Sequence, residues 1–153
     1  MGKRRNKKNA SLALTALSVL GGLVAVIMLF LPAVAIKDMS NTYTGLQTAF
    51  GYTKGEGALK VEIFKFSFMN LLPYLLALGG LVFSALGAAG RGSKLGAIIA
   101  AAAFIAAGVF FIMSNTFCEY LFGKDVLAIA YGAIVAAVAS FVAGACQLFK
   151  AIF

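Results

Sequence analysis

Few side chains in this 153-residue chain have the types or the spacing that chemistry requires. The chain holds two cysteines, Cys118 and Cys146, and no histidine, so the commonest metal ligand and neutral-pH proton carrier is absent. Cys118 directly precedes Glu119, and a neighbouring carboxylate disfavours the thiolate that a nucleophile needs. We therefore expect no catalytic residue and no enzymatic activity.

Metal and cofactor sites also lack the residues that they need. The carboxylates of Glu119 and Asp125 are too few for Ca²⁺, which takes about 6–8 oxygen ligands, and two cysteines cannot form a four-ligand zinc site. The glycine clusters lie within apolar stretches rather than after strands, so they match neither a phosphate-binding loop nor a dinucleotide fingerprint. The sequence predicts no metal and no cofactor.

The elements that would have to position any site are membrane spans. The chain is 62% hydrophobic and 12% charged, whereas a soluble domain is about half apolar and about a quarter charged. Stretches without any charged residue are 9–36, 66–90, 95–118 and 126–149. A helix needs about 20 apolar residues to cross a bilayer, and backbone polar groups must be paired in lipid. We predict one all-α integral membrane domain over 1–153, a four-helix transmembrane bundle with spans at about 10–35, 68–90, 95–114 and 126–149.

The distribution of charge predicts the orientation of these spans. Eight of the 13 Lys and Arg residues lie before the first span, between the second and third, or after the fourth, with no acidic residue beside them. The other five share the outer loops 37–67 and 115–125 with all five acidic residues, so the formal charge of +8 lies on one side. By the positive-inside rule this side and both termini are cytoplasmic. The basic N-terminus is then expected to meet anionic lipid rather than nucleic acid.

A secretory signal is the competing interpretation of the first span. A basic start, an apolar run and Ala33-Val34-Ala35 resemble a signal with its cleavage site. The apolar run exceeds the about 7–15 residues of a signal core, so we expect the span to be retained, and cleavage after Ala35 stays an open alternative. The outer loops carry no glycosylation sequon, which fits a multi-pass protein of a bacterial plasma membrane.

The first outer loop is expected to fold into a small extracytoplasmic cap. Thr44 and Gln47 have capping-box spacing, with Tyr43, Leu46 and Phe50 on one helical face and Gly51 as a C-cap. This pattern predicts a short interfacial helix. The glycine-rich stretch 51–57 predicts a turn, and 60–68 has the β-branched and aromatic composition of an extended strand.

The second outer loop echoes the first. Met-Ser-Asn-Thr followed by an aromatic residue occurs at 39–43 and at 113–117, and a Phe-Gly pair ends both 39–51 and 113–123. Thr116 and Glu119 repeat the capping-box spacing. One interpretation is a parallel 2+2 duplication of the chain. The alternative is two interfacial turns that use the same capping residues.

Small residues recur at helical spacing within the spans, which lets helix backbones approach closely. The candidate packing or assembly residues are Gly21, Gly22, Gly79, Gly80, Ser84, Ala128, Gly132, Ala136, Ser140 and Gly144. The glycine pairs 21–22 and 79–80 lie near the midpoints of the first two spans and predict that these spans touch there. We favour tight helix packing over a substrate site at the midplane. The small-residue face of the fourth span could have an internal partner or a second copy.

These observations predict a non-enzymatic tetraspan protein that assembles with itself or with another membrane protein. The candidate outer contact surface is Tyr43, Leu46, Phe50, Asn70, Phe117, Glu119, Tyr120 and Phe122. Within it, Asn70 is expected to bond the outer loop or a neighbouring helix. The alternative function is a subunit of an oligomeric channel or small-solute transporter, which the possible duplication and the glycine pairs would support.

Overall fold

A computed structural model describes residues 2–153, with the side chains of residues 1–4 outside the described part. Four long helices form a bundle: α1 (Gly2–Ile27), α3 (Phe68–Ala88), α4 (Lys94–Ile112) and α5 (Tyr131–Ile152). All four are long and apolar enough to cross a membrane, which confirms the number of predicted helices. The N-terminal side chains Lys3 and Arg4, part of the predicted lipid contact, are not described.

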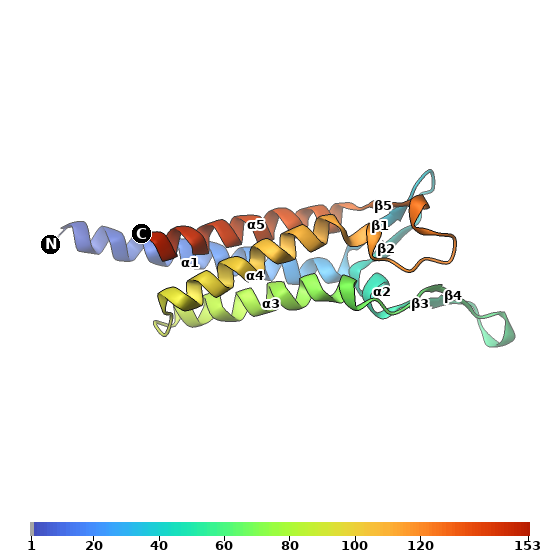
Figure 1. The fold of residues 1–153 in the computed structure, drawn as a ribbon, viewed down its shortest axis with the longest axis horizontal. Coiled ribbons are helices and arrows are strands. Elements are labelled where there is room, and N and C mark those ends of the chain that lie inside the picture. Colours follow the sequence, from blue (N-terminus) through green and yellow to red (C-terminus); the bar gives the residue numbers. More distant parts are fainter. Residues whose placement is uncertain (1) are drawn as a thin grey trace.

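The bundle has two different ends (Figure 1). One end, here called the terminal end, holds both chain termini and the turn between α3 and α4. The opposite end carries the cap, defined as residues 31–67 and 113–130, in which short strands and helical turns fold together. The fold is therefore mostly helical but includes a small amount of sheet, which the prediction of one possible strand underestimated.

The first and fourth predicted spans are wrong at their cap ends. α1 stops at Ile27, a 3₁₀ turn follows at Met28–Phe30, and β1 (Pro32–Ile36) replaces the last part of the predicted helix. Pro32 has no N–H to donate and pushes the preceding residue out of helical geometry, and Leu31 is accordingly extended. In the fourth span, β5 (Leu127–Ile129) precedes the helix. A short apolar run on a buried strand has the same composition as part of a span.

β1 is the central strand of a sheet with the order β2-β1-β5, where β2 is Thr42–Thr44. Both pairings are antiparallel: Ala35 lies opposite Thr42 on one side and Ala128 on the other. Ala33 and Val34 are almost fully buried. Because β2 belongs to the first outer loop and β5 to the second, β1 joins the two loops into one cap.

A second small sheet consists of β3 (Tyr52–Lys54) and β4 (Val61–Phe64), with a 3₁₀ turn at Gly57–Leu59 between them. The predicted strand at 60–68 is confirmed over 61–64. On its other side β4 meets the second outer loop, because Phe64 bridges to Tyr120 and the Leu121 N–H donates to the Ile63 carbonyl at 3.1 Å. The second outer loop thus supplies a strand to the first sheet and pairs with the edge of the second sheet through an isolated bridge.

The predicted short helix is confirmed as α2 (Gly45–Phe50), but Tyr43, which was expected on its apolar face, lies on β2. The capping box is complete: the Thr44 N–H donates to Gln47 Oε1 at 3.0 Å, and the Gln47 N–H donates to Thr44 Oγ1 at 3.3 Å. Gly51 ends the helix at a φ of +92°, a backbone conformation that glycine adopts without a steric penalty.

The second predicted capping box, at Thr116 and Glu119, is wrong. A 3₁₀ turn covers Ser114–Thr116, and the Thr116 hydroxyl donates back to the Met113 carbonyl at 2.6 Å. The chain beyond it pairs with β4 instead of starting a helix. The two similar segments are alike at their final glycine, since Gly123 has a φ of +93° and Gly51 a φ of +92°. The rest of their backbone differs. The duplication of the chain stays a hypothesis.

The helices turn small residues toward one another and large ones outward. Buried alanines of the four helices are Ala25, Ala77, Ala97, Ala100, Ala101, Ala107, Ala133, Ala136, Ala137 and Ala143. Exposed positions carry leucine, isoleucine, valine and phenylalanine. Small residues let the backbones approach closely, and close packing is a main source of helix association in lipid.

Phe104 fills the centre of the bundle between two of the predicted glycines. A Cβ added at Gly80 would lie 3.0 Å from three ring atoms of Phe104, and one at Gly22 would lie 2.9 Å from its Cζ. One glycine of each pair faces this ring, which is fully buried. A Cβ on Gly22 would also lie 3.2 Å from Leu81 Cβ of α3, so the first two long helices touch here, as expected. The ring occupies the space that a midplane substrate site would need.

The other candidate packing residues lie mainly within the chain. A Cβ on Gly21 would meet the Ala139 carbonyl of α5, one on Gly144 would meet Ile105 of α4, and one on Gly132 would meet the Pro32 carbonyl of β1. Ala136 and Ser140 are fully buried. Ala128 lies on β5, and a Cβ on Gly79 would have nothing within 4 Å. The small-residue face of α5 therefore has internal partners.

Three polar side chains meet near the terminal end. Ser18 of α1 and Ser84 of α3 are hydrogen-bonded at 3.0 Å, and Gln147 Nε2 of α5 donates to Ser84 Oγ at 2.8 Å. All three are at most 1% exposed. Pairing removes the cost of burying these groups in an apolar surrounding, and it links three helices.

Neighbouring glycines in α3 provide a matched test of this packing. We expect Gly80→Leu to lower the free energy of unfolding by about 1–3 kcal/mol, because the added side chain must displace Phe104. Gly79→Leu should have little effect, since its Cβ would meet no atom within 4 Å. Thermal unfolding in detergent, followed by circular dichroism, measures both. Equal unfolding temperatures for the two variants would contradict the central role of Phe104.

Candidate functional site

A groove lies in the cap where the two sheets and the second outer loop meet. Its volume is about 440 Å³, within the range of about 300–1,000 Å³ for ligand sites. The lining residues are Ile36, Lys37, Met39, Asn41, Tyr43, Lys54, Ile63, Tyr120, Phe122 and Val126. They come from both outer loops, so the groove exists only because β1 and β4 bring the loops together.

Aromatic rings form one wall of this cap groove. Tyr43 and Tyr120 line the groove and both pack on the buried ring of Phe64: the Tyr43 ring is edge-on with centroids 4.8 Å apart, and the Tyr120 centroid lies 5.1 Å away. Tyr120 also contacts Phe122 at 5.7 Å, and Phe122 is 73% exposed. Burial and the neighbouring Tyr120 and Tyr52 raise the pKa of Tyr43. The Tyr43 hydroxyl, like that of an ordinary tyrosine, is protonated at neutral pH and can donate a hydrogen bond.

The charged side chains among the described lining residues are both cationic. Lys37 and Lys54 line the groove from opposite sheets, and Lys37 Nζ donates to the Asp125 carbonyl at 2.8 Å, which fixes its position. A smaller recess of about 210 Å³ adjoins them, lined by Ser40, Asn41, Thr42, Tyr43, Tyr52 and Lys54. Two lysines beside aromatic rings and hydroxyl groups favour an anionic group with an apolar neighbour.

The predicted contact residues divide into three groups. Tyr43, Tyr120 and Phe122 line the groove. Leu46, Phe50 and Phe117 do not line it: the Phe50 ring lies near Phe66 with centroids 6.4 Å apart, and the Phe117 ring near Phe110 with centroids 5.8 Å apart. Glu119 is exposed, and its backbone carbonyl accepts a hydrogen bond from the Lys65 N–H.

Asn70 is the remaining member of the predicted surface, and it is buried. Its side-chain N–H₂ donates to Cys118 Sγ at 3.0 Å and to the Thr48 carbonyl at 3.5 Å. The expectation that it bonds the outer loop is confirmed. Asn70 joins α3, α2 and the second loop, so it holds the cap on the bundle rather than facing a partner.

Sequence analysis missed the two lysines of the groove. Lys37 lies at the start of the first loop and Lys54 lies near its middle, and the strand pairings bring them to one cavity. Their signal in the sequence is weak, because the same loop carries other lysines and acidic residues that balance them. Only the pairing of β1 with β2 and of β3 with β4 distinguishes them from Lys60 or Lys65.

Comparison of the chain with protein-family profiles, with curated proteins and with solved structures finds no match.

Cys118 offers a test of how firmly the cap is closed. The thiol is fully buried and donates to the Ser114 carbonyl at 3.3 Å, and burial raises its pKa to about 11. At pH 8 about one Cys118 thiol in a thousand is then ionised. In a Cys146→Ala background, we expect iodoacetamide labelling of Cys118 to rise steeply from pH 8 to pH 10. A cysteine introduced at exposed Ser40 should already react near its plateau at pH 9. Equal pH profiles for the two thiols would contradict a buried Cys118.

Proposed function

We propose that this chain is a multi-pass membrane protein that acts by binding a protein partner, and not by catalysis, through the cap groove. Beyond the charged residues at the terminal end, the exposed faces of the four long helices are apolar, which suits lipid and not water. By the positive-inside rule, the terminal end lies in the cytoplasm and the cap outside a bacterial plasma membrane. The cap is then the part of the protein that meets other molecules in solution.

The observation that carries this proposal is the meeting of both outer loops around one groove with an aromatic wall and two lysines. Exposed aromatic side chains such as Phe122 are typical of interface anchors, because they bury a large apolar area when a partner covers them. Lys37 and Lys54 add complementarity to a carboxylate on that partner. The proposed occupant is an extended segment of another protein with an acidic side chain next to an apolar one.

Edge strands support an extended occupant. β2 and β3 are edge strands of their sheets, and residues of both line the recess that adjoins the groove. An edge strand presents backbone N–H and C=O groups that another chain can pair with, and strand addition is a common mode of peptide recognition. A partner segment laid between β2 and β3 would use backbone pairing for affinity and the two lysines for specificity.

A channel or transporter formed by a single copy has less support. Phe104 is fully buried between Gly22 and Gly80 in the centre of the bundle, so a path at that level would need the ring to move away. A permeation path would therefore have to lie between copies, and no contact of the described residues favours such an assembly over the cap groove.

The orientation can be tested with single cysteines, because both native cysteines are buried. In intact spheroplasts, a membrane-impermeant maleimide is expected to label Ser40→Cys in the cap. It should label Arg91→Cys at the terminal end only after lysis. Both positions are exposed on the protein surface, so any difference in labelling reports which side of the membrane each position lies on. The opposite pattern would invert the proposed topology.

Partner binding can be tested with a photo-crosslinking amino acid at Phe122, which lines the groove. We expect a crosslinked product in the native membrane that Lys54→Glu reduces about tenfold, because the substitution reverses the charge facing the partner. Lys60→Glu is the matched control, since Lys60 is exposed on the same hairpin but does not line the groove.

A second control places the crosslinker at Leu59, which is 82% exposed at the tip of the hairpin. It should not capture the same product. If Lys54→Glu and Lys60→Glu reduce crosslinking equally, or if Leu59 captures the product as well as Phe122, the groove is not the binding site.

A further inference from the structure

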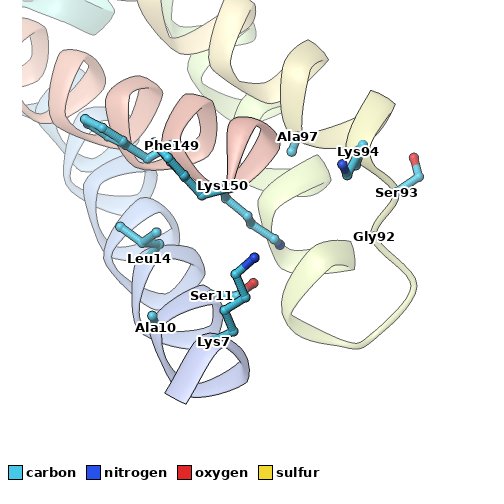
Figure 2. Close-up of a pocket in the computed structure, with 11 residues that line it drawn as sticks. Lys7, Ala10, Ser11, Leu14, Gly92, Ser93, Lys94, Ala97, Phe149 and Lys150 are labelled. Atoms are coloured by element: carbon cyan, nitrogen blue, oxygen red, sulfur yellow. The ribbon is translucent and has the colours of Figure 1, made fainter. Parts of the chain in front are cut away.

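A second cavity lies at the terminal end of the bundle, on the side opposite the cap (Figure 2). Its volume is about 280 Å³, and it lies between α1, the turn before α4 and the end of α5. The lining residues are Lys7, Ala10, Ser11, Leu14, Gly92, Ser93, Lys94, Ala97, Phe149, Lys150 and Phe153. This basic pocket takes no part in the proposed cap binding.

Lysines enter the basic pocket from three helices. Lys7 lies on α1, Lys94 on α4 and Lys150 on α5, and Figure 2 shows the amino ends of Lys7 and Lys150 pointing into the same space. All five acidic side chains of the chain lie in the cap, so no acidic side chain lies near these lysines. The lysines repel one another in the empty pocket, and a bound anion would offset this electrostatic repulsion.

Lys150 is held in place within the end of the bundle. It is half-buried, and its Nζ lies 2.8 Å from the point that a Cβ on Gly87 would occupy, so it rests against the last turn of α3. The partial negative charge of a helix C-terminus favours a cation at this position. A neighbouring cavity of about 360 Å³ shares Ser11, Gly92 and Lys150 with the pocket and adds Lys8. The positive-inside rule explains why basic residues gather at the terminal end. It does not explain why the Lys150 ammonium packs against α3.

The remaining wall of the pocket is apolar. Leu14 and Phe149 lie next to the lysines, and the ring of Phe149 stacks on Phe153 with centroids 6.3 Å apart. A purely aqueous anion would gain nothing from these side chains. A ligand that joins a phosphate to a hydrocarbon chain would use both walls.

We propose that the basic pocket binds an anionic phospholipid, with its headgroup phosphate among Lys7, Lys94 and Lys150 and its acyl chain starting along Leu14 and Phe149. The site rests on the proposed insertion into a membrane, which brings the pocket to a membrane surface, and not on which of the two surfaces that is. It does not rest on partner binding in the cap, so crosslinking at Phe122 reports on the two proposals separately.

Native mass spectrometry of the full chain in a neutral detergent tests the proposal. Phosphatidylglycerol is titrated onto the protein, with phosphatidylcholine as the lipid without net charge. We expect retained phosphatidylglycerol, and Lys7→Gln with Lys150→Gln should weaken its binding about tenfold or more. The matched control, Arg5→Gln with Arg91→Gln, removes the same charge from exposed positions of the same end that do not line the pocket. It should change binding less than about twofold.

Two further variants separate ligand binding from folding. Ala10→Phe fills the pocket from an exposed position while every lysine remains, and it should also weaken phosphatidylglycerol binding. Lys7→Arg with Lys150→Arg keeps both charges and should retain the lipid. Gel filtration of each variant shows whether the bundle is intact.

Three outcomes would overturn the proposal. Equal losses in the glutamine pair and in the arginine control would mean that the charge of the whole end, and not the pocket, attracts the lipid. Equal binding of phosphatidylcholine would remove the role of the lysines. Displacement of the lipid by millimolar inorganic phosphate or glycerol phosphate would make the site one for a free phosphate compound. If only the cysteine-labelling pattern is inverted while phosphatidylglycerol still binds, the orientation fails and the pocket stands.

Discussion

The close approach of helix backbones is the constraint on which the rest of this structure depends. Alanine, glycine and serine cover the faces that the four long helices turn to one another. In lipid the hydrophobic effect does not drive helices together, so packing and a few hydrogen bonds must hold the bundle. One large side chain, Phe104, is accommodated because Gly22 and Gly80 leave room for its ring. The bonded trio of Ser18, Ser84 and Gln147 then links three helices closer to the terminal end.

The close packing also determines where binding can occur. A bundle whose centre is filled by an aromatic ring has its cavities at its two ends, and the cap groove and the basic pocket lie there. The groove is built from strands that tie distant parts of the chain together, and it combines lysines with tyrosines. The pocket is built from helix ends, and it combines lysines with aliphatic and phenyl groups. Under the two proposals, the cap groove would bind a ligand from the aqueous phase and the basic pocket one from the membrane.

The sequence predicts the features that depend on local pattern. Apolar length predicts the four helices, and the spacing of Thr44 and Gln47 predicts α2 with its capping box. The same spacing at Thr116 and Glu119 misleads, because the chain there finds a strand partner in β4 and does not continue as a helix. Local propensity is a weak prior when tertiary pairing competes with it.

Features that depend on pairing between distant segments escape sequence reasoning. β1 and β5 were assigned to spans because buried strands and buried helices have the same apolar composition. The groove lysines and the pocket lysines each converge from separate elements, and nothing in their spacing marks them. By contrast, the expectation that Asn70 bonds the outer loop was correct, because an amide at the end of an apolar helix must find a partner nearby.

The position of β1 between β2 and β5 has a consequence for the order in which the protein is made. During synthesis β1 and β2 are complete early, whereas β5 follows the third long helix and comes just before the last one. Until β5 arrives, one edge of β1 has no strand beside it, and an open apolar edge invites pairing with other chains. A ribosome that stalls before residue 127 would release a chain in which several helices have formed but one edge of β1 is still unpaired. The last strand to be translated thus covers the open edge of β1 and removes this site of aggregation from the cap.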